Sequence, residues 1–226
     1  LHPKIHAGIL NKRNMKSHSS DIKKNNFENI DLVIVNFYPF EKIMEQTKNH
    51  LKIIENIDVG GPTMVRAAAK NYNDVTVITS VDHYSELINE LKKNKGSTSF
   101  KFREKMSRLA FGETAYYDAV ISNYLNKFNN INFPKRKIFY TNLIENLRYG
   151  ENPHQMGAFY SQNIKNKLKQ MHGKTLSYNN YNDIFAALTI SKSLPKNTGT
   201  VIIKHGNPCG VSALKNNFDS YKSALQ

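Results

Sequence analysis

The sequence predicts an α/β fold with a parallel sheet, on three observations. Residues 31–36 and 75–79 form short, continuous apolar runs bounded by polar residues, which is typical of strands buried on both faces of a parallel sheet. Segments with helical spacing of apolar residues lie between and after these runs. A turn at Gly60 and Gly61 opens directly into one such helix. Alternating strands and helices indicate an α/β domain.

The start of the chain favours irregular structure. His2 and His6 are four residues apart, a spacing that could serve a metal on a helix. Pro3 and Gly8 argue against a regular helix here, and a third ligand is not evident, so a metal site is disfavoured. Residues 14–29 are polar and predict an exposed loop.

Helices and a domain boundary are expected further along. Helical spacing covers residues 45–56 and 98–128, the second as one long helix. Asp82 is placed to cap a helix that runs to about residue 94. Residues 129–136 are polar and contain a proline, so we predict one domain over residues 1–132 and a second over 133–226.

The composition limits the possible functions. Cys209 is the single cysteine, which excludes an internal disulfide and fits a reducing cytoplasm. The sequence has no run of about 18 apolar residues, so we expect no membrane span. The net charge of +14 is compatible with nucleic-acid binding. Lysines far outnumber arginines and are spread along the chain, which favours a solvated basic surface instead.

The stretch DVGGPTMVRAAAK, from Asp58 to Lys70, carries the most informative pattern. Gly60 and Gly61 permit a sharp turn and a close approach of a ligand, and Pro62 suits the first helical position. The free N–H groups of a helix start attract anionic ligand atoms. A carboxylate and a lysine in the same stretch could transfer protons. The alternative is a plain strand-to-helix connection with a solvated lysine.

Four other segments carry candidate functional residues. FYPF follows the first apolar run, at the carboxyl end where open α/β sheets place ligands. LRYGENPHQ (147–155) and GKTLSYNNYNDIFAA (173–187) come later. TVIIKHGNPCG (200–210) predicts a buried strand and a polar tip, where a histidine could move a proton and a lysine could stabilise negative charge. An exposed Lys-His loop is the alternative.

These segments resemble, in the same order, the motifs of the bifunctional enzymes that join AICAR transformylase to IMP cyclohydrolase. LHPKIHAGIL, VIVNFYPF and DVGGPTMVRAAAKN resemble the cyclohydrolase half, and the later segments resemble the transformylase half. The resemblance implies a methylglyoxal-synthase-like parallel-sheet domain followed by the start of a cytidine-deaminase-like domain. It also implies that stretches of both family domains lie outside these 226 residues.

The resemblance implies roles for individual residues. His205 would accept the proton of the AICAR amine with help from Lys204, and Lys70 would donate or accept a proton in ring closure. The implied catalytic residues are Tyr38, Asp58, Lys70, Lys204 and His205. The implied substrate-binding residues are Val35, Asn36, Val59, Gly60, Gly61, Arg148, Tyr149, Asn180, Asp183 and Asn207. For Asp183, a plain helix cap is an equal alternative.

The reaction follows from the same resemblance. A formyl group passes from 10-formyltetrahydrofolate to AICAR, giving FAICAR, and ring closure with loss of water gives IMP. The resemblance implies a cytoplasmic homodimer and a cyclohydrolase that needs no metal. We expect the isolated 226-residue segment to have little or no activity.

Two other classes stay open. A non-catalytic regulatory module could share the cyclohydrolase fold, although the later motifs argue against it because such a module has no transformylase segment. A nucleic-acid binder would lose affinity steeply with salt, and we expect only weak, non-specific binding.

Overall fold

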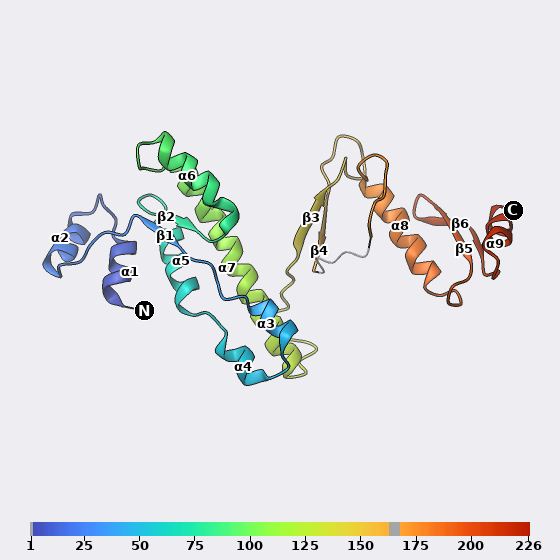
Figure 1. The fold of residues 1–226 in the computed structure, drawn as a ribbon, viewed down its shortest axis with the longest axis horizontal. Coiled ribbons are helices and arrows are strands. Elements are labelled where there is room, and N and C mark those ends of the chain that lie inside the picture. Colours follow the sequence, from blue (N-terminus) through green and yellow to red (C-terminus); the bar gives the residue numbers. More distant parts are fainter. Residues whose placement is uncertain (1, 163–167) are drawn as a thin grey trace. The chain divides into compact units, whose positions relative to one another are not determined.

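The chain forms two compact units, residues 1–140 and 141–226 (Figure 1). The computed structural model describes residues 2–162 and 168–226, so Leu1 of the LHPKIHAGIL motif lies outside the described residues. The first unit contains elements α1 to α7, and the second contains β3 to α9.

The division falls after residue 140 because the segment that follows the long helix α7 (Phe100–Phe128) packs back onto it. The side-chain amide of Asn123 donates to the Ile138 carbonyl at 3.0 Å. The ring of Tyr140 packs edge-on against Tyr116, with the ring centroids 5.2 Å apart. The functional boundary between residues 132 and 133 stays a prediction.

A small parallel sheet lies in the first unit. Strand β1 (Leu32–Ile34) pairs in parallel with β2 (Thr76–Ile78), which confirms the predicted parallel α/β pattern. Every residue of β2 is buried, whereas Leu32 and Ile34 of β1 are 37% and 46% exposed. The expectation that residues 31–36 are buried on both faces is therefore wrong. In the described part of the chain β1 has one neighbouring strand.

Seven α-helices and one short 3₁₀ helix of the described chain belong to the first unit. Besides α7 they are α1 (Pro3–Leu10), α2 (Lys16–Lys24), α3 (Phe40–Gln46), α4 (His50–Glu55), α5 (Gly60–Lys70), η1 (Val81–His83) and α6 (Tyr84–Lys93). The predicted long helix over residues 98–128 is confirmed as α7.

Four local expectations are wrong. Pro3 is the first helical residue of α1, a position that tolerates proline, so a helix does form there. Residues 14–29 contain the exposed helix α2. Residues 45–56 do not form one helix, because Asn49 caps a separate helix α4 by accepting from the Lys52 N–H. Ser80, not Asp82, provides the cap before η1.

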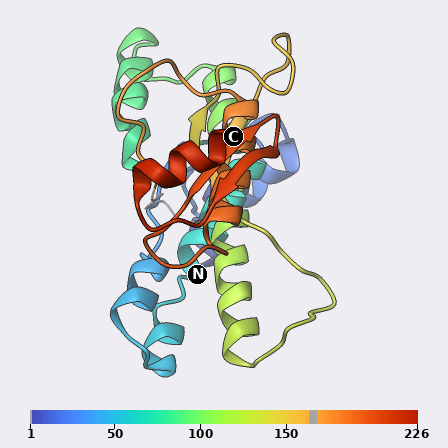
Figure 2. The ribbon, with the colours of Figure 1, turned by 90° about the vertical axis from the view of Figure 1, so that its right-hand side faces the viewer.

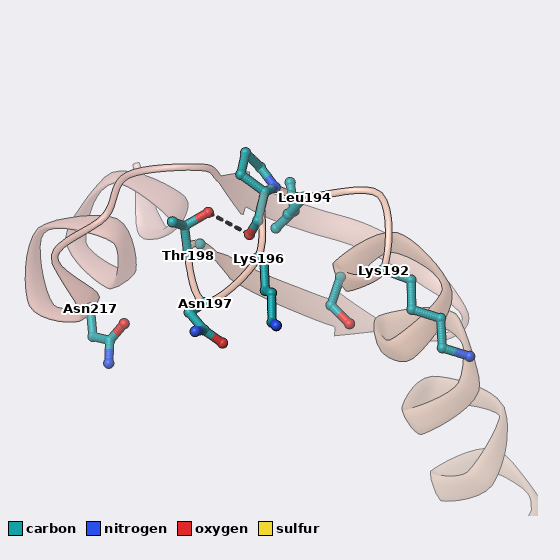
Figure 3. Close-up of a pocket in the computed structure, with 9 residues that line it drawn as sticks. Lys192, Leu194, Lys196, Asn197, Thr198 and Asn217 are labelled. Carbon is teal, nitrogen blue, oxygen red and sulfur yellow. Dashed lines mark hydrogen bonds between the residues drawn. The ribbon is translucent and has the colours of Figure 1, made fainter.

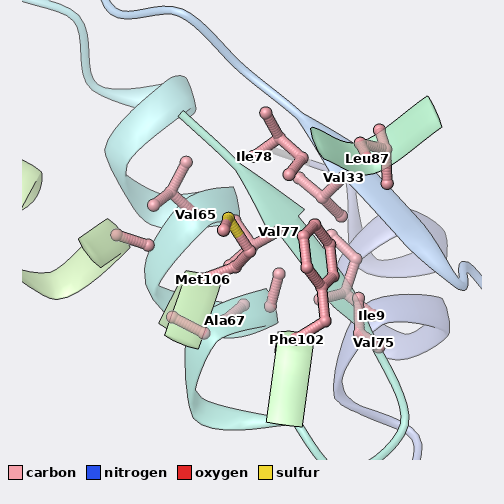
Figure 4. Packing of buried hydrophobic residues seen from close by; sticks show 13 residues of the cluster. Ile9, Val33, Val65, Ala67, Val75, Val77, Ile78, Leu87, Phe102 and Met106 are labelled. Atoms are coloured by element: carbon pink, nitrogen blue, oxygen red, sulfur yellow. The ribbon is translucent and has the colours of Figure 1, made fainter. Parts of the chain in front are cut away.

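Helix α5 lies at the centre of the first unit's core (Figure 4). Val65 and Ala68 of α5 are fully buried, against residues of β2 and α7. Just after α5, the buried side chain of Asn71 donates to the Ile9 carbonyl of α1 at 2.8 Å. Ser107 of α7 donates to a carbonyl of α5 at 2.7 Å. These bonds hold α1 and α7 against the carboxyl-terminal end of α5.

The described residues of the second unit form two antiparallel strand pairs and two helices. Its elements are β3 (Asn142–Asn146), β4 (Ala158–Ser161), α8 (Tyr178–Ser191), β5 (Thr200–Lys204), β6 (Asn207–Ser212) and α9 (Asn217–Leu225). Strands β3 and β4 form one pair, β5 and β6 form a hairpin, and α9 packs along that hairpin (Figure 2). The predicted buried strand at residues 200–204 is β5, but it is only partly buried in this two-stranded sheet.

No helix in the described ranges of the chain combines the length and the apolar character needed to span a bilayer.

Stacked aromatic rings join α8 to the β3–β4 pair. The ring of Tyr181 on α8 stacks on Phe159 of β4, with centroids 4.6 Å apart, and also on Phe185. The Tyr181 hydroxyl donates to the carboxylate of Glu145 on β3. Burial, followed by this carboxylate, raises the pKa of Tyr181 to about 12.

The raised pKa predicts a loss of stability at high pH. Because the folded state holds the Tyr181 proton more tightly than the unfolded state, this contribution is complete below about pH 10 and is lost as pH rises towards 12. We expect urea unfolding between pH 9 and 12 to show a steeper decline for the unchanged protein than for Tyr181→Phe. Equal slopes would contradict the prediction.

Candidate functional sites

The first candidate site is a cavity of about 420 Å³ at the carboxyl ends of β1 and β2. Its lining includes Asn36 and Tyr38, which follow β1, and Ser80, which follows β2. The side chain of Asn36 donates to the Tyr84 hydroxyl at 3.1 Å. Tyr38 is 55% exposed, so its phenol is accessible to a ligand. The cavity thus lies where ligands bind open α/β sheets.

The start of α5 is tied by a hydrogen bond to one residue of the cavity wall. Tyr117, which lines the cavity, accepts a hydrogen bond from the Asp58 N–H at 2.8 Å. The Asp58 carboxylate in turn accepts from the Gly61 N–H at 2.8 Å and caps the first turn of α5. The predicted residues Asp58, Val59, Gly60 and Gly61 therefore lie together beside Tyr117.

The two glycines of this turn are not equivalent. A Cβ at Gly61 would overlap the Asp58 carboxylate, whereas a Cβ at Gly60 would meet no atom within 4 Å. Of these two glycines, only Gly61 leaves no room for a Cβ unless the Asp58 carboxylate moves. The space beside Gly60 is open, as a position for ligand approach must be.

Lys70 is not brought to this cavity. It is the last residue of α5 and is exposed. Ten residues separate it from Gly60 along α5, a distance of about 15 Å at the rise of an α-helix. The carboxylate of Asp58 and the amine of Lys70 therefore belong to opposite ends of one helix.

Two further residues of the cavity wall were not predicted as functional. Glu113 and Tyr117 both lie on the long helix α7 and line the cavity. Desolvation at the wall, and then the Glu41 carboxylate, raise the pKa of Glu113. Burial is also the main reason for the raised pKa of Tyr117. Both pKa shifts favour the neutral form of the side chain over its charged form. The sequence pattern gives no signal for either shift.

The second candidate site is built around the start of α8. The N–H of Arg148 donates to the Leu176 carbonyl at 2.8 Å, and the N–H of Tyr178 donates to the Tyr149 carbonyl at 3.1 Å. These backbone bonds place Arg148 and Tyr149 beside the first turn of α8, which contains Asn180.

The Arg148 and Tyr149 side chains also contact each other. The Arg148 guanidinium lies over the Tyr149 ring, 4.9 Å from its centroid, and donates to the phenol oxygen at 3.2 Å. The hydrogen bond with Ser177, followed by the one from Arg148, lowers the pKa of Tyr149.

Asp183 connects α8 to the tip of the β5–β6 hairpin. Its carboxylate accepts from the Gly206 N–H at 2.7 Å, and Lys204 and His205 adjoin that glycine. The alternative that Asp183 caps α8 is wrong, because the cap is Ser177, which forms a capping box with Asn180. The structure therefore connects all three predicted transformylase motifs at the first two turns of α8.

A larger surface hollow contains none of the predicted residues. It has a volume of about 610 Å³ and lies at the carboxyl-terminal end of α8, where the Thr198 hydroxyl donates to the Pro195 carbonyl (Figure 3). Its two lysines, Lys192 and Lys196, are exposed. The described residues also include no group of three or more His, Cys, Asp or Glu side chains placed to hold a metal ion.

Comparison with known proteins identifies the family. The model of the family described as "AICARFT/IMPCHase bienzyme" matches residues 68–226, which include the end of α5 and the whole second unit. The chain belongs to this family.

Curated relatives extend the match to the whole chain. Proteins named "Bifunctional purine biosynthesis protein PurH" from Bradyrhizobium diazoefficiens and Thermoanaerobacter sp. are 44% and 43% identical over 100% of this chain. The aligned region is 44% and 45% of those proteins, so the chain spans less than half of their length. The solved structure titled "Crystal structure of ForH" has 26% identity and a TM-score of 0.48, over 55% of this chain and 65% of that one.

The unequal roles of the two glycines can be tested directly. We expect Gly61→Ala to displace the Asp58 cap and to lower the free energy of unfolding by about 1–2 kcal/mol. Gly60→Ala, the matched control, should be neutral or stabilising by about 0.5 kcal/mol, because it meets open space. Urea unfolding followed by circular dichroism measures both. Equal destabilisation by the two variants would contradict the geometry.

Proposed function

We propose that the protein carrying this chain performs two consecutive steps of purine synthesis. It transfers a formyl group from 10-formyltetrahydrofolate to AICAR, and it closes the product FAICAR to IMP with loss of water. The observation that carries the proposal is the gathering of Arg148, Tyr149, Asn180 and His205 at the first two turns of α8, within the region that matches the family.

The second unit supplies the groups for formyl transfer. The AICAR amine attacks the formyl carbon, the bond from that carbon to N10 of the folate breaks, and tetrahydrofolate leaves with a proton on N10. His205 accepts the proton that the amine loses, and Lys204 stabilises the negative charge that develops on the formyl oxygen. The Arg148 guanidinium suits the phosphate of the nucleotide. Tyr149, Asn180 and Asn207 complete the contacts with the substrate.

The first unit supplies the nucleotide site for ring closure. The carboxamide nitrogen attacks the formyl carbon, and the hydroxyl formed there leaves as water. Val35, Asn36, Val59, Gly60 and Gly61 hold the nucleotide beside the helix start, which favours an anion. Tyr38 lines the cavity, where its phenol is accessible to the oxygen on the formyl carbon that leaves in ring closure. Asp58 lies beside the turn that starts α5.

The role of Lys70 rests on the family resemblance alone. Its place at the far end of α5 does not support a direct partnership with Asp58. We keep it as the proton donor or acceptor of ring closure because the DVGGPTMVRAAAKN motif carries it. Lys70 is therefore the residue whose substitution tests this part of the proposal most severely. A cytoplasmic location and a homodimeric assembly are further parts of the proposal.

An assay of the complete protein tests the two steps separately. Given AICAR and 10-formyltetrahydrofolate, the unchanged protein should form IMP. Loss of a general acid or base should cost about 100- to 10,000-fold. His205→Ala should therefore form almost no FAICAR, and Lys70→Ala should accumulate FAICAR.

The controls are exposed residues of the same types, His172→Ala and Lys196→Ala, which should keep full activity. If Lys70→Ala forms IMP at the normal rate, the role of Lys70 is wrong and the distance along α5 explains why. If the unchanged protein catalyses neither step, the regulatory-module alternative replaces the proposal.

A further inference from the structure

One peptide unit, between His205 and Gly206, forms the tip of the β5–β6 hairpin. Lys204 pairs with Asn207, so the loop contains only these two residues. Both have left-handed backbone angles, with φ values of 54° and 74°. Two consecutive positive φ values are the mark of the tight hairpin turn that usually contains Asn or Gly. A positive φ is uncommon for residues other than glycine, although histidine is among the more frequent exceptions.

Two side chains hold this single peptide unit from its two ends. The carboxylate of Asp183 accepts from the Gly206 N–H at 2.7 Å. The side-chain amide of Asn207 donates to the His205 carbonyl at 3.0 Å. The last strand pair of the hairpin is Lys204 with Asn207, so the Gly206 N–H and the His205 carbonyl lie beyond the strand ladder. Side chains bind both of these groups instead. The peptide plane cannot rotate without the loss of both hydrogen bonds.

Asp183 is itself firmly placed. It lies in the second turn of α8, which starts at the buried Ser177 cap and is anchored by the buried ring of Tyr181. A Cβ at Gly206 would approach the Asn182 side chain to 3.1 Å, so this turn of α8 fits closely against the hairpin tip. The helix therefore acts as a rigid support for the orientation of the peptide.

We propose that Asp183 and Asn207 are positioning residues that clamp the His205–Gly206 peptide and thereby orient the His205 side chain. The backbone angles of His205 set the direction of its Cα–Cβ bond, and the clamp fixes one of those two angles. The proposal rests on the proposed role of His205 in formyl transfer. It gives Asp183 a different role from the substrate contact that the family resemblance implies, and it gives Asn207 a second role besides its proposed contact with the substrate.

The clamp predicts a particular kinetic pattern in the complete protein. Asp183→Ala should lower the kcat of formyl transfer by about 10- to 100-fold, since a small displacement of a reacting group has effects of this size. The KM for AICAR should change less than about threefold, because substrate contacts remain. Asp183→Asn keeps an oxygen that can accept from the Gly206 N–H, so it should restore most of the activity.

Hydrogen exchange gives a readout that does not depend on activity. The Gly206 amide should exchange about 10-fold faster in Asp183→Ala than in the unchanged protein, since a hydrogen bond to a charged acceptor is lost. Exchange within α8 should stay the same. Asn207→Ala, which removes the other end of the clamp at an exposed position, should lower kcat in the same way. Asp219→Ala on α9 is the matched control and should change neither measurement.

Two outcomes would overturn the clamp. If Asp183→Ala raises the KM for AICAR and leaves kcat and Gly206 exchange unchanged, Asp183 is a substrate contact. If Asp183→Asn is as impaired as Asp183→Ala while Gly206 exchange is normal, the carboxylate charge matters and not the hydrogen bond. If the unchanged protein forms no FAICAR, the proposed function fails, and the exchange experiment still decides whether the clamp exists.

Discussion

The cap of α8 is the constraint on which the second unit depends. Ser177 is almost fully buried, and its hydroxyl accepts from the N–H of Asn180. The residues on either side of Ser177 pair through their backbone with Arg148 and Tyr149. The same cap fixes where the second turn of α8 begins, and therefore where Asp183 meets the hairpin. One buried serine thus sets the relative positions of two segments more than fifty residues apart in the sequence.

The first unit follows the same rule with different residues. There the cap of α5 is a carboxylate, Asp58, which accepts from Gly61, and Tyr117 of the long helix accepts from the backbone of Asp58. In both units a helix start is tied by a polar side chain to a segment distant in the sequence. Helix starts attract negative charge, and each of these two helix starts lies beside residues that we assign to substrate binding.

The sequence was sufficient to predict features that depend on local patterns. Continuous apolar runs predicted β1 and β2, and helical spacing predicted α7. Features that depend on distant partners were not predictable. Leu32 and Ile34 of β1 are exposed although the run is apolar, and β3 carries no regular alternation of buried and exposed residues. Asp183 resembled a cap because an acidic residue near a helix start is usually one, whereas its real partner is Gly206 on the hairpin.

Asn180 shows how the cap also defines the chemistry available to a ligand. Its side-chain oxygen is already used, because it accepts from both the N–H and the hydroxyl of Ser177 at 3.0 Å. Among residues 2–162 and 168–226, no acceptor is found for its amide nitrogen, so a ligand at this edge meets a donor. The Arg148 guanidinium beside it consists only of donors. An edge of this kind suits ligand oxygen atoms that accept hydrogen bonds, such as those of a phosphate. It offers few acceptors to a ligand that must donate hydrogen bonds.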